Sequence, residues 1–213
     1  MNNSDTIIWD WNGTLLNDVD ICLESINELL DSRNLKPLNK EEYRHIFTFP
    51  VRDYYVKAGF DFSKEPFDEV AVEFIDLYHE KLAGTGLFEE VIDVLEFFKQ
   101  REFKQVMVSA MEHNSLLTSV AHLGIEKYFE NINGIDDHFA ESKITLARKI
   151  INDNFQNGSN ITLIGDTLHD AEVAGDLGID CILVARGHQS HERLLKSGCS
   201  VVKDLSEIIE MFK

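Results

Sequence analysis

Residues 6–14, which read TIIWDWNGT, constrain the fold of this 213-residue chain more than any other stretch. They open with a short run of apolar β-formers at 7–9 that stops at a carboxylate, Asp10. A buried parallel strand ends in this way at the edge of an α/β sheet, and open sheets bind ligands beyond the carboxyl ends of their strands. The next pair, Asn12 and Gly13, predicts a tight turn in which the glycine lets backbone approach a ligand closely.

Polar groups recur later in the chain where strands are predicted to end or helices to begin. A hydroxyl ends the strand predicted at 104–109, an ammonium begins the helix predicted at 143–154, and two carboxylates flank the end of the strand predicted at 161–166. These groups are Ser109, Lys143, Asp166 and Asp170. Since the carboxyl ends of parallel strands share one edge of a sheet, we expect all four near Asp10.

Between Leu15 and Thr85 the apolar spacing is helical and gives no strand signal. It predicts a helix at 18–34, two short helices within 39–60 that break at Pro50, and a longer helix at 65–82. We therefore expect an all-helical cap at residues 16–85, inserted after the first strand into a core of residues 1–15 and 86–213. Two hinges, at 15–18 and 83–86, would join cap and core.

In the core, strands and helices alternate. Besides the segments above, the pattern predicts helices at 89–100, 115–123, 170–177 and 205–212, and strands at 131–133, 181–184 and 201–202. Such alternation predicts a parallel sheet covered by helices on both faces and joined by right-handed crossovers. The expected fold class is α/β, with a Rossmann-like parallel sheet and the inserted helical cap.

An Asp, a Ser, a Lys and an Asp pair, met in this order over about 160 residues, resemble the four motifs of the haloacid dehalogenase-like superfamily of hydrolases. The resemblance covers nearly the whole chain. Within the superfamily, the chain is most similar to the phosphoglycolate phosphatase-like members. It implies a Mg²⁺-dependent hydrolase of a small phosphate monoester that works through an aspartyl-phosphate on Asp10. A carboxylate can attack phosphorus in this way and split hydrolysis into two easier steps.

The resemblance also implies the metal ligands. Asp10 and Asp166 would ligate Mg²⁺ directly, Asp170 through water or as support, and the backbone carbonyl of Asn12 would add another ligand. The residues themselves favour this, because Asp166 and Asp170 are four apart and, in the first turn of a helix, would share one face. Hard oxygen ligands suit Mg²⁺. An alternative is that either carboxylate caps the helix, and for Asp170 both interpretations can hold.

The predicted phosphate grip is Ser109 and Lys143, a hydroxyl and a point charge for the transferring phosphoryl oxygens. The predicted substrate-binding set is Trp11, Thr14, Ser109, Ala110, Lys143 and Arg52. Arg52, in the cap, would clamp a second anionic group of the substrate, with a surface ion pair as the alternative. An aromatic-rich set in the cap is more typical of a cap core than of a substrate-stacking site; it comprises Phe47, Phe49, Tyr54, Tyr55, Phe60 and Phe62.

Asn12 departs from the pattern of phosphatases in this superfamily, which usually carry a second Asp there as general acid and base. An amide cannot exchange that proton, and loss of a general acid–base typically costs a factor of about 10²–10⁴ in rate. His113 and His169 are candidates for a surrogate, against the alternative of solvated loop histidines. Two further functions stay open: a dehalogenase- or phosphonatase-like hydrolase, the latter using a cap lysine, and a catalytically impaired phosphate-binding protein. The cap lysines in question are Lys57, Lys64 and Lys81.

The formal net charge of −18 argues against nucleic acid and anionic membranes as partners, because both need Lys/Arg patches. An acidic protein that handles phosphate must recruit a cation, a lysine or backbone amides. We expect a small phosphorylated metabolite as the partner, and a monomer or weak homodimer. The N-terminal residues lack a basic region followed by an apolar run, and the three cysteines lack CxxC spacing, so we expect a cytoplasmic protein without disulfides or a zinc site.

Overall fold

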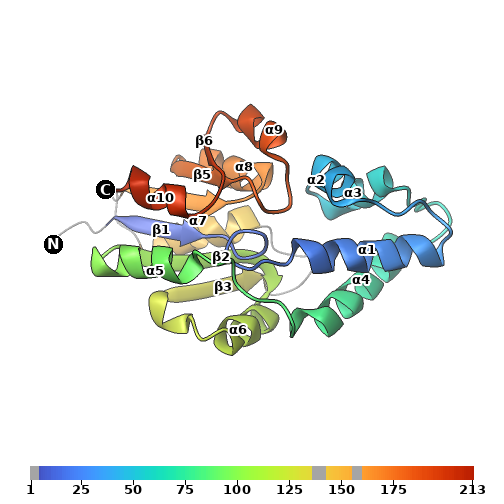
Figure 1. The fold of residues 1–213 in the computed structure, drawn as a ribbon, viewed down its shortest axis with the longest axis horizontal. Helices are drawn as coiled ribbons and strands as arrows, with labels where there is room; N and C mark the ends of the chain where they lie inside the picture. Colours follow the sequence, from blue (N-terminus) through green and yellow to red (C-terminus); the bar gives the residue numbers. More distant parts are fainter. Residues whose placement is uncertain (1–4, 136–142, 155–159) are drawn as a thin grey trace.

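The computed structural model describes residues 5–135, 143–154 and 160–213. Its centre is a six-stranded sheet in the order β3-β2-β1-β4-β5-β6, with every neighbouring pair parallel. The strands are β1 (Thr6–Trp9), β2 (Lys104–Glu112), β3 (Asn131–Ile135), β4 (Ile161–Gly165), β5 (Asp180–Val184) and β6 (Ser200–Val202). β1 lies in the middle of the sheet, so the loop that follows it meets the ends of β2 and β4 (Figure 1). The predicted α/β fold class is confirmed.

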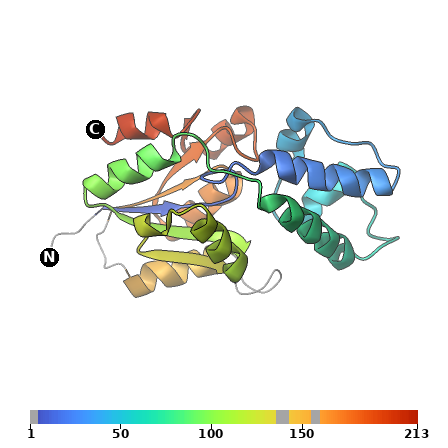
Figure 2. The same cartoon turned by 60° about the horizontal axis from the view of Figure 1, so that its bottom comes forward.

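Helices cover both faces of the sheet (Figure 2). One face packs against α5 (Val91–Gln100), α6 (His113–His122) and α10 (Ser206–Met211), and the other against α7 (Lys143–Asn154) and α8 (Leu168–Leu177). The shorter elements are η1 (Glu126–Tyr128), α9 (His191–Leu194) and η2 (Leu195–Ser197). Strand alternation explains the two layers: Ile7 and Trp9 of β1 enter the cluster with α5, while Ile8 enters the one with α7 and α8.

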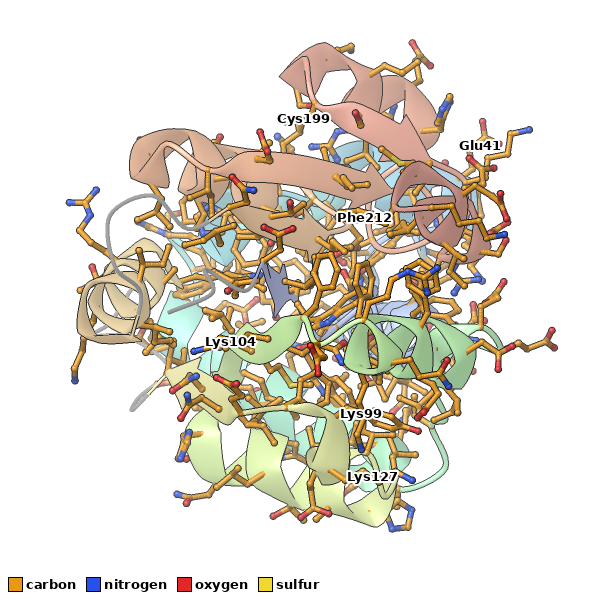
Figure 3. All side chains as sticks on the ribbon, turned by 90° about the vertical axis from the view of Figure 1, so that its left-hand side faces the viewer. Glu41, Lys99, Lys104, Lys127, Cys199 and Phe212 are labelled. Carbon is orange, nitrogen blue, oxygen red and sulfur yellow. The ribbon has the colours of Figure 1, made fainter. Side chains whose placement is uncertain are left out.

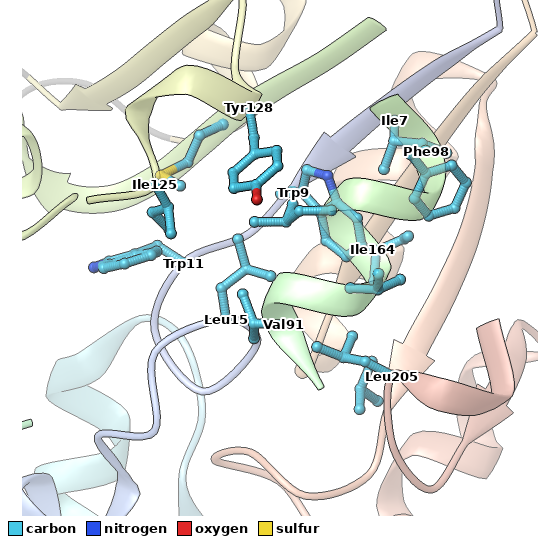
Figure 4. Packing of buried hydrophobic residues seen from close by; sticks show 14 of the residues in the cluster. Ile7, Trp9, Trp11, Leu15, Val91, Phe98, Ile125, Tyr128, Ile164 and Leu205 are labelled. Carbon is cyan, nitrogen blue, oxygen red and sulfur yellow. The ribbon is translucent and has the colours of Figure 1, made fainter. Parts of the chain in front are cut away.

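Trp9 holds the centre of the first layer. Its ring meets Phe98 of α5 edge-on, with centroids 5.8 Å apart, and its Nε1 donates to the Gln105 side chain at 3.0 Å (Figure 4). An indole buried with its N–H satisfied combines a large apolar area with a fixed orientation. At the end of the sheet away from α1, the C-terminal Phe212 packs on Phe98 and Phe103, with centroids 5.0 and 5.8 Å away (Figure 3). These contacts fix β1, and with it the start of the loop that carries Asp10.

The segment between β1 and α5 contains the helices α1 (Val19–Ser32), α2 (Lys40–Ile46), α3 (Val51–Ala58) and α4 (Phe67–Leu82) and no strand, over residues that are all described. They lie beyond the carboxyl ends of the strands (Figure 1) and share an apolar cluster that includes Ile26, Leu30, Tyr43 and Val70. The predicted helical insertion is confirmed, with Pro50 standing between α2 and α3. The division into domains at 15/16 and 85/86 stays a prediction.

The two connections to the insertion run side by side. Asn17 N–H donates to the Gly86 carbonyl at 3.0 Å, and Phe88 N–H donates to the Leu15 carbonyl at 3.1 Å. Paired backbone of this kind holds the insertion over the end of β1. No helix in the described part of the chain is long and apolar enough to cross a bilayer.

Candidate active site

Asp10 is the first residue after β1 and is buried, with 7% of its surface exposed. Its Oδ1 pairs with the ammonium of Lys143, the first residue of α7, which also lies 2.6 Å from Asp170 Oδ1. The Thr14 hydroxyl lies 3.1 Å from Asp10 Oδ2, from the turn that follows β1. The crossover that ends in α7 therefore brings a cation from 133 residues away onto the carboxylate at the strand tip.

Two more carboxylates stand beside Asp10. Asp166 follows β4, accepts the backbone N–H of His188, and has its Oδ1 3.4 Å from the Thr14 hydroxyl. Asp170 lies in the first turn of α8, where its Oδ2 accepts from the backbone N–H and hydroxyl of Thr167 at 3.0 and 2.7 Å. Carboxylate oxygens of Asp10, Asp166 and Asp170 all lie within 4.8 Å of one another.

The sequence prediction placed Asp166 and Asp170 together for a reason that is wrong in part. α8 begins at Leu168, two residues before the predicted start. Because Asp166 still precedes Leu168, it lies in the connection between β4 and α8 and not on a helical face. Thr167 is the N-cap, and it forms a capping box with Asp170. Asp170 thus supports the start of α8, as one of its two interpretations held, and its other oxygen lies against Lys143. Its part in a metal site stays a prediction.

The electrostatics of this trio call for a further cation. Burial raises the pKa of Asp10 to about 6, against the pull of Lys143, and raises the pKa of Asp166 well above its ordinary value. Burial acts on Asp170 too, but Lys143 and the Thr167 hydrogen bonds hold the pKa of that carboxyl below its usual range. The Lys143 ammonium contacts two of the three buried carboxylates, Asp10 and Asp170, and the positive group that acts on Asp166 is His188. Hard, oxygen-only ligands with a charge deficit fit a divalent cation such as Mg²⁺.

Glycines keep the space around Asp166 open. A Cβ at Gly187, or at Gly13, would collide with the Asp166 carboxylate, and Gly13 has a φ of +71°, in the left-handed region. We expect Gly13→Ala to lower the free energy of unfolding by about 1–3 kcal/mol, because alanine adds both strain and a clash. Chemical denaturation measures the change.

The matched control for this substitution is Gly175→Ala, in an exposed stretch of α8 where an added Cβ meets nothing within 4 Å. It should leave stability unchanged or raise it by about 0.5–1 kcal/mol, because alanine is the better helix former. Equal losses for the two variants would contradict a special constraint at Gly13.

Asn12 is locked by a network that the sequence did not reveal. Its Nδ2 donates to Asp18 Oδ2 at 2.8 Å and to the Tyr78 hydroxyl at 2.9 Å, and Gly13 N–H donates to Asp18 Oδ1 at 2.7 Å. Burial would raise the pKa of Asp18, but His188 and these donors hold it below its usual value. An ionised carboxylate accepts only, so the amide nitrogen must face Asp18. Asn12 Oδ1 then faces the Ser109 hydroxyl, at 3.4 Å.

His188 completes this network from the loop after β5. Its Nε2 lies 3.3 Å from Asp18 Oδ1, its Nδ1 lies 2.7 Å from the Tyr43 hydroxyl, and its ring stacks on Phe47 with centroids 4.9 Å apart. Burial would lower the pKa of His188, but Asp18 raises it to about 9, so the imidazolium persists at neutral pH. Sequence reasoning missed Asp18, Tyr78 and His188. Only His188 carried a signal, since it too follows the carboxyl end of a predicted strand.

The structure brings most of the predicted site residues together. Ser109 is fully buried and its hydroxyl accepts from Met111 N–H at 3.0 Å, while Ala110 lines the same cavity as Asp10, Asn12, Lys143, Asp166 and Asp170. Two predicted residues lie elsewhere. The Trp11 ring is in the hydrophobic core beside Ile125 (Figure 4), and Arg52 is exposed with its guanidinium 5.8 Å from the Phe62 ring. Neither Trp11 nor Arg52 is among the residues that line the cavity, and their part in substrate binding stays a prediction.

Of the histidines proposed as general acid–base groups and the three cap lysines, only one histidine lines the cavity. His169 lines the cavity, with its ring 4.9 Å from that of Phe49, whereas His113 lies outside it and accepts from Gly134 N–H. Of all lysines and arginines in the described residues, Lys143 is the one that lines this cavity. Lys57, Lys64 and Lys81 do not, so the structure offers no cap lysine for phosphonatase chemistry.

Comparison with known proteins identifies relatives of the chain. The family model for haloacid dehalogenase-like hydrolases matches residues 7–184. A phosphoglycolate phosphatase from Rhodobacter capsulatus is 22% identical over 86% of this chain and 85% of its own, and the pyrophosphatase PpaX from Bacillus pumilus is 25% identical over 92% and 91%. Among solved structures, a haloacid dehalogenase-like hydrolase from Streptococcus pneumoniae superposes with a TM-score of 0.85 at 18% identity, over 100% of both chains.

Proposed function

The chain belongs to the haloacid dehalogenase-like hydrolases, and we propose that it hydrolyses a small phosphate monoester, with the Asp10 carboxylate as the nucleophile. The observation that carries this proposal is the meeting of Asp10, Lys143, Asp166 and Asp170 in one buried cluster at the carboxyl edge of the sheet. Two of the relatives named above are a phosphoglycolate phosphatase and a pyrophosphatase, which supports phosphorus as the centre attacked.

Each residue has a task that follows from its position. Asp10 is ionised at pH 7, because its pKa of about 6 lies below that pH, and it can attack phosphorus to form an aspartyl-phosphate. Lys143 offers its charge to the phosphoryl oxygens, and Ser109 and Thr14 offer hydroxyls. A divalent cation held by Asp10, Asp166 and the Asn12 carbonyl, with Asp170 in support, would add positive charge where the transferring group gains negative charge.

The alternatives differ from this proposal at particular residues. A dehalogenase would not need three buried carboxylates as a cation site, and a phosphonatase lacks its cap lysine here. A phosphate-binding protein with impaired turnover is favoured by Asn12, whose amide donates to Asp18 and cannot act as a general acid or base near neutral pH. That alternative stays open, because it uses the same phosphate-binding residues and differs from the proposed phosphatase only in the rate of turnover. Two further predictions are unchanged: the protein is a monomer or weak homodimer, and it is cytoplasmic.

A panel of phosphate monoesters, assayed with and without Mg²⁺, tests the proposal. Phosphate should be released with Mg²⁺ and lost on chelation. Ligand binding with no phosphate release from any ester would favour the impaired binding protein, and halide release from haloacids would favour the dehalogenase.

We expect Asp166→Asn to weaken Mg²⁺ binding by about 10²-fold or more, because even residues that only orient a ligand contribute 10–100-fold. Isothermal calorimetry measures the affinity directly and needs no turnover. The matched control is Asp176→Asn, which changes an exposed carboxylate of α8 and should leave Mg²⁺ binding as in the wild type. Undiminished affinity in Asp166→Asn would remove the metal site.

A further inference from the structure

The cavity that holds the Asp10 cluster continues into the helical insertion. It encloses about 270 Å³ and reaches from the carboxylates at the sheet edge to side chains of the loop after α2 and of α4. Beyond the catalytic cluster its walls are largely apolar, and they include Phe47, Phe49, Phe74, Ile75, Tyr78 and Met111. Since a cavity of about 150 Å³ can hold a benzene ring, this space has room for a phosphoryl group and one ring.

Carboxylates outnumber the positive groups around this cavity, which are Lys143 and His188. Lys143 is the single lysine or arginine among the described lining residues, and it is already paired with Asp10 and Asp170. Glu112 and Asp18 add two more carboxylates to the lining. The segments 136–142 and 155–159, which are outside the described residues, contain no lysine or arginine at all.

The histidines of the lining do not change this balance. His188 is paired with Asp18, and His169 lies 3.2 Å from Glu172. His79 is exposed at the end of α4. A second anionic group on a substrate would therefore lose its hydration among carboxylates and aromatic rings without gaining a dedicated counter-ion, which is unfavourable.

We propose, on the basis of the phosphatase function above, that the substrate is a phosphate monoester whose alcohol part is uncharged and apolar, of about the size of one ring with a short chain. The ring would lie among Phe47, Phe49, Phe74 and Ile75 while the phosphoryl group lies at Asp10. In the net reaction one water is consumed: the P–O bond to the alcohol breaks, the alcohol leaves with a proton from water, and the phosphate keeps the water oxygen. A hydroxy-acid phosphate such as phosphoglycolate is then a poor substrate.

A matched pair of non-hydrolysable phosphonates tests the preference without any turnover. 4-Phenylbutylphosphonate and 5-phosphonopentanoate share the phosphonate and a similar chain and differ in whether the far end is a ring or a carboxylate. Calorimetry on the wild-type protein with Mg²⁺ should show about 10–100-fold tighter binding of the phenyl compound, since burial of an aromatic side chain contributes about 1.5–3 kcal/mol. Equal affinities, or tighter binding of the carboxylate, would overturn the proposal.

Two hydrolysable esters keep this proposal separate from the function on which it rests. They are 3-phenylpropyl phosphate and 4-phosphonooxybutanoate, in which an ester oxygen replaces the methylene next to phosphorus in the two phosphonates. If neither ester releases phosphate while the phenyl phosphonate still binds more tightly, the phosphatase assignment fails and the specificity of the cavity stands. If both are hydrolysed but the carboxylate ester has the higher kcat/KM, the phosphatase assignment stands and the proposed specificity is wrong.

A substitution in α4 should change the preference. Ile75→Arg places a guanidinium in the wall, and it should tighten the carboxylate phosphonate by about tenfold or more and weaken the phenyl one. Val72→Arg is the matched control, because Val72 is 50% exposed on the same helix and does not line the cavity. It should keep the wild-type ratio. A preference that moves equally in both variants would show that surface charge, and not the cavity wall, sets it.

Discussion

Asp10→Asn is expected to lower kcat on any phosphate monoester by about 10⁴-fold or more, because an amide cannot form the covalent intermediate that divides the reaction into two steps. The substitution is nearly isosteric, and it leaves Ser109, Lys143 and Asp166 in place. Steady-state phosphate release, measured at saturating Mg²⁺, gives the ratio.

Stability provides the control for this variant. Asp10 shares the Lys143 ammonium with Asp170, and burial raises the pKa of Asp10 to about 6, so at pH 7 its charge opposes folding. Asparagine removes that charge, and thermal unfolding without metal should show a melting temperature at or above that of the wild type. A folded Asp10→Asn protein that keeps more than about a tenth of the activity would place the nucleophile elsewhere.

The exchange Asn12→Asp with Asp18→Asn is expected to raise kcat by about 10²-fold or more, since general acid–base catalysis contributes 10²–10⁴-fold. Both changes are needed, because Asn12 Nδ2 lies 2.8 Å from Asp18 Oδ2 and an aspartate at 12 alone would face a second carboxylate there. In the exchanged protein the amide introduced at position 18 can donate to the new carboxylate and still accept from Gly13 N–H. The net charge is conserved.

The single variants are the controls for this exchange. Asp18→Asn alone should bring no gain, and Asn12→Asp alone should gain less than the exchange and lose stability through like-charge repulsion. Peptide mass analysis of residue 12 should be run beside the assay, to check that the wild-type amide stays intact. If the folded exchange variant is no faster than the wild type, Asn12 does not limit turnover and another group transfers the proton.

Local sequence patterns predicted the positions of the cluster well because each member stands at the end of a strand or the start of a helix. The apolar run at 7–9 fixes where β1 ends, and so places Asp10, while the same rule places Asp166. Ser109, predicted at the end of its strand, lies within β2, which continues to Glu112. Lys143 depends in addition on a crossover that packs α7 on the sheet face next to β2. Parallel α/β topology brings these ends to one edge, so the juxtaposition follows from the order of elements alone.

The network around Asn12 could not be predicted, because it depends on how the helical insertion sits over the sheet. Tyr78 comes from α4, 66 residues after Asn12, and His188 comes from the loop after β5. No local sequence pattern predicts that these side chains contact Asp18. Their contacts arise from long-range packing, including the bonds that Arg44 of α2 donates to the carbonyls of Arg186 and Gly187.

The aromatic residues of the insertion show the same limit. Tyr54, Tyr55 and Phe60 are buried in the insertion's apolar cluster, as the sequence interpretation held. Phe47, Phe49, Tyr54 and Tyr55 also line the cavity, with Phe47 against His188 and Phe49 against His169, so for these four the interpretation as cap core is incomplete. Which aromatic side chains of the insertion reach the cavity depends on tertiary packing, and no local pattern predicts it.

Mass spectrometry after rapid acid quench tests most directly whether hydrolysis proceeds through Asp10. The wild-type protein is mixed with Mg²⁺ and a phosphate monoester that it turns over, quenched within one turnover, and digested. The peptide that contains Asp10 should carry one added phosphoryl group, located at that residue by fragmentation, and the Asp10→Asn protein should show no adduct. A phosphoryl group on any other residue of the wild type would contradict the assignment of Asp10 as nucleophile.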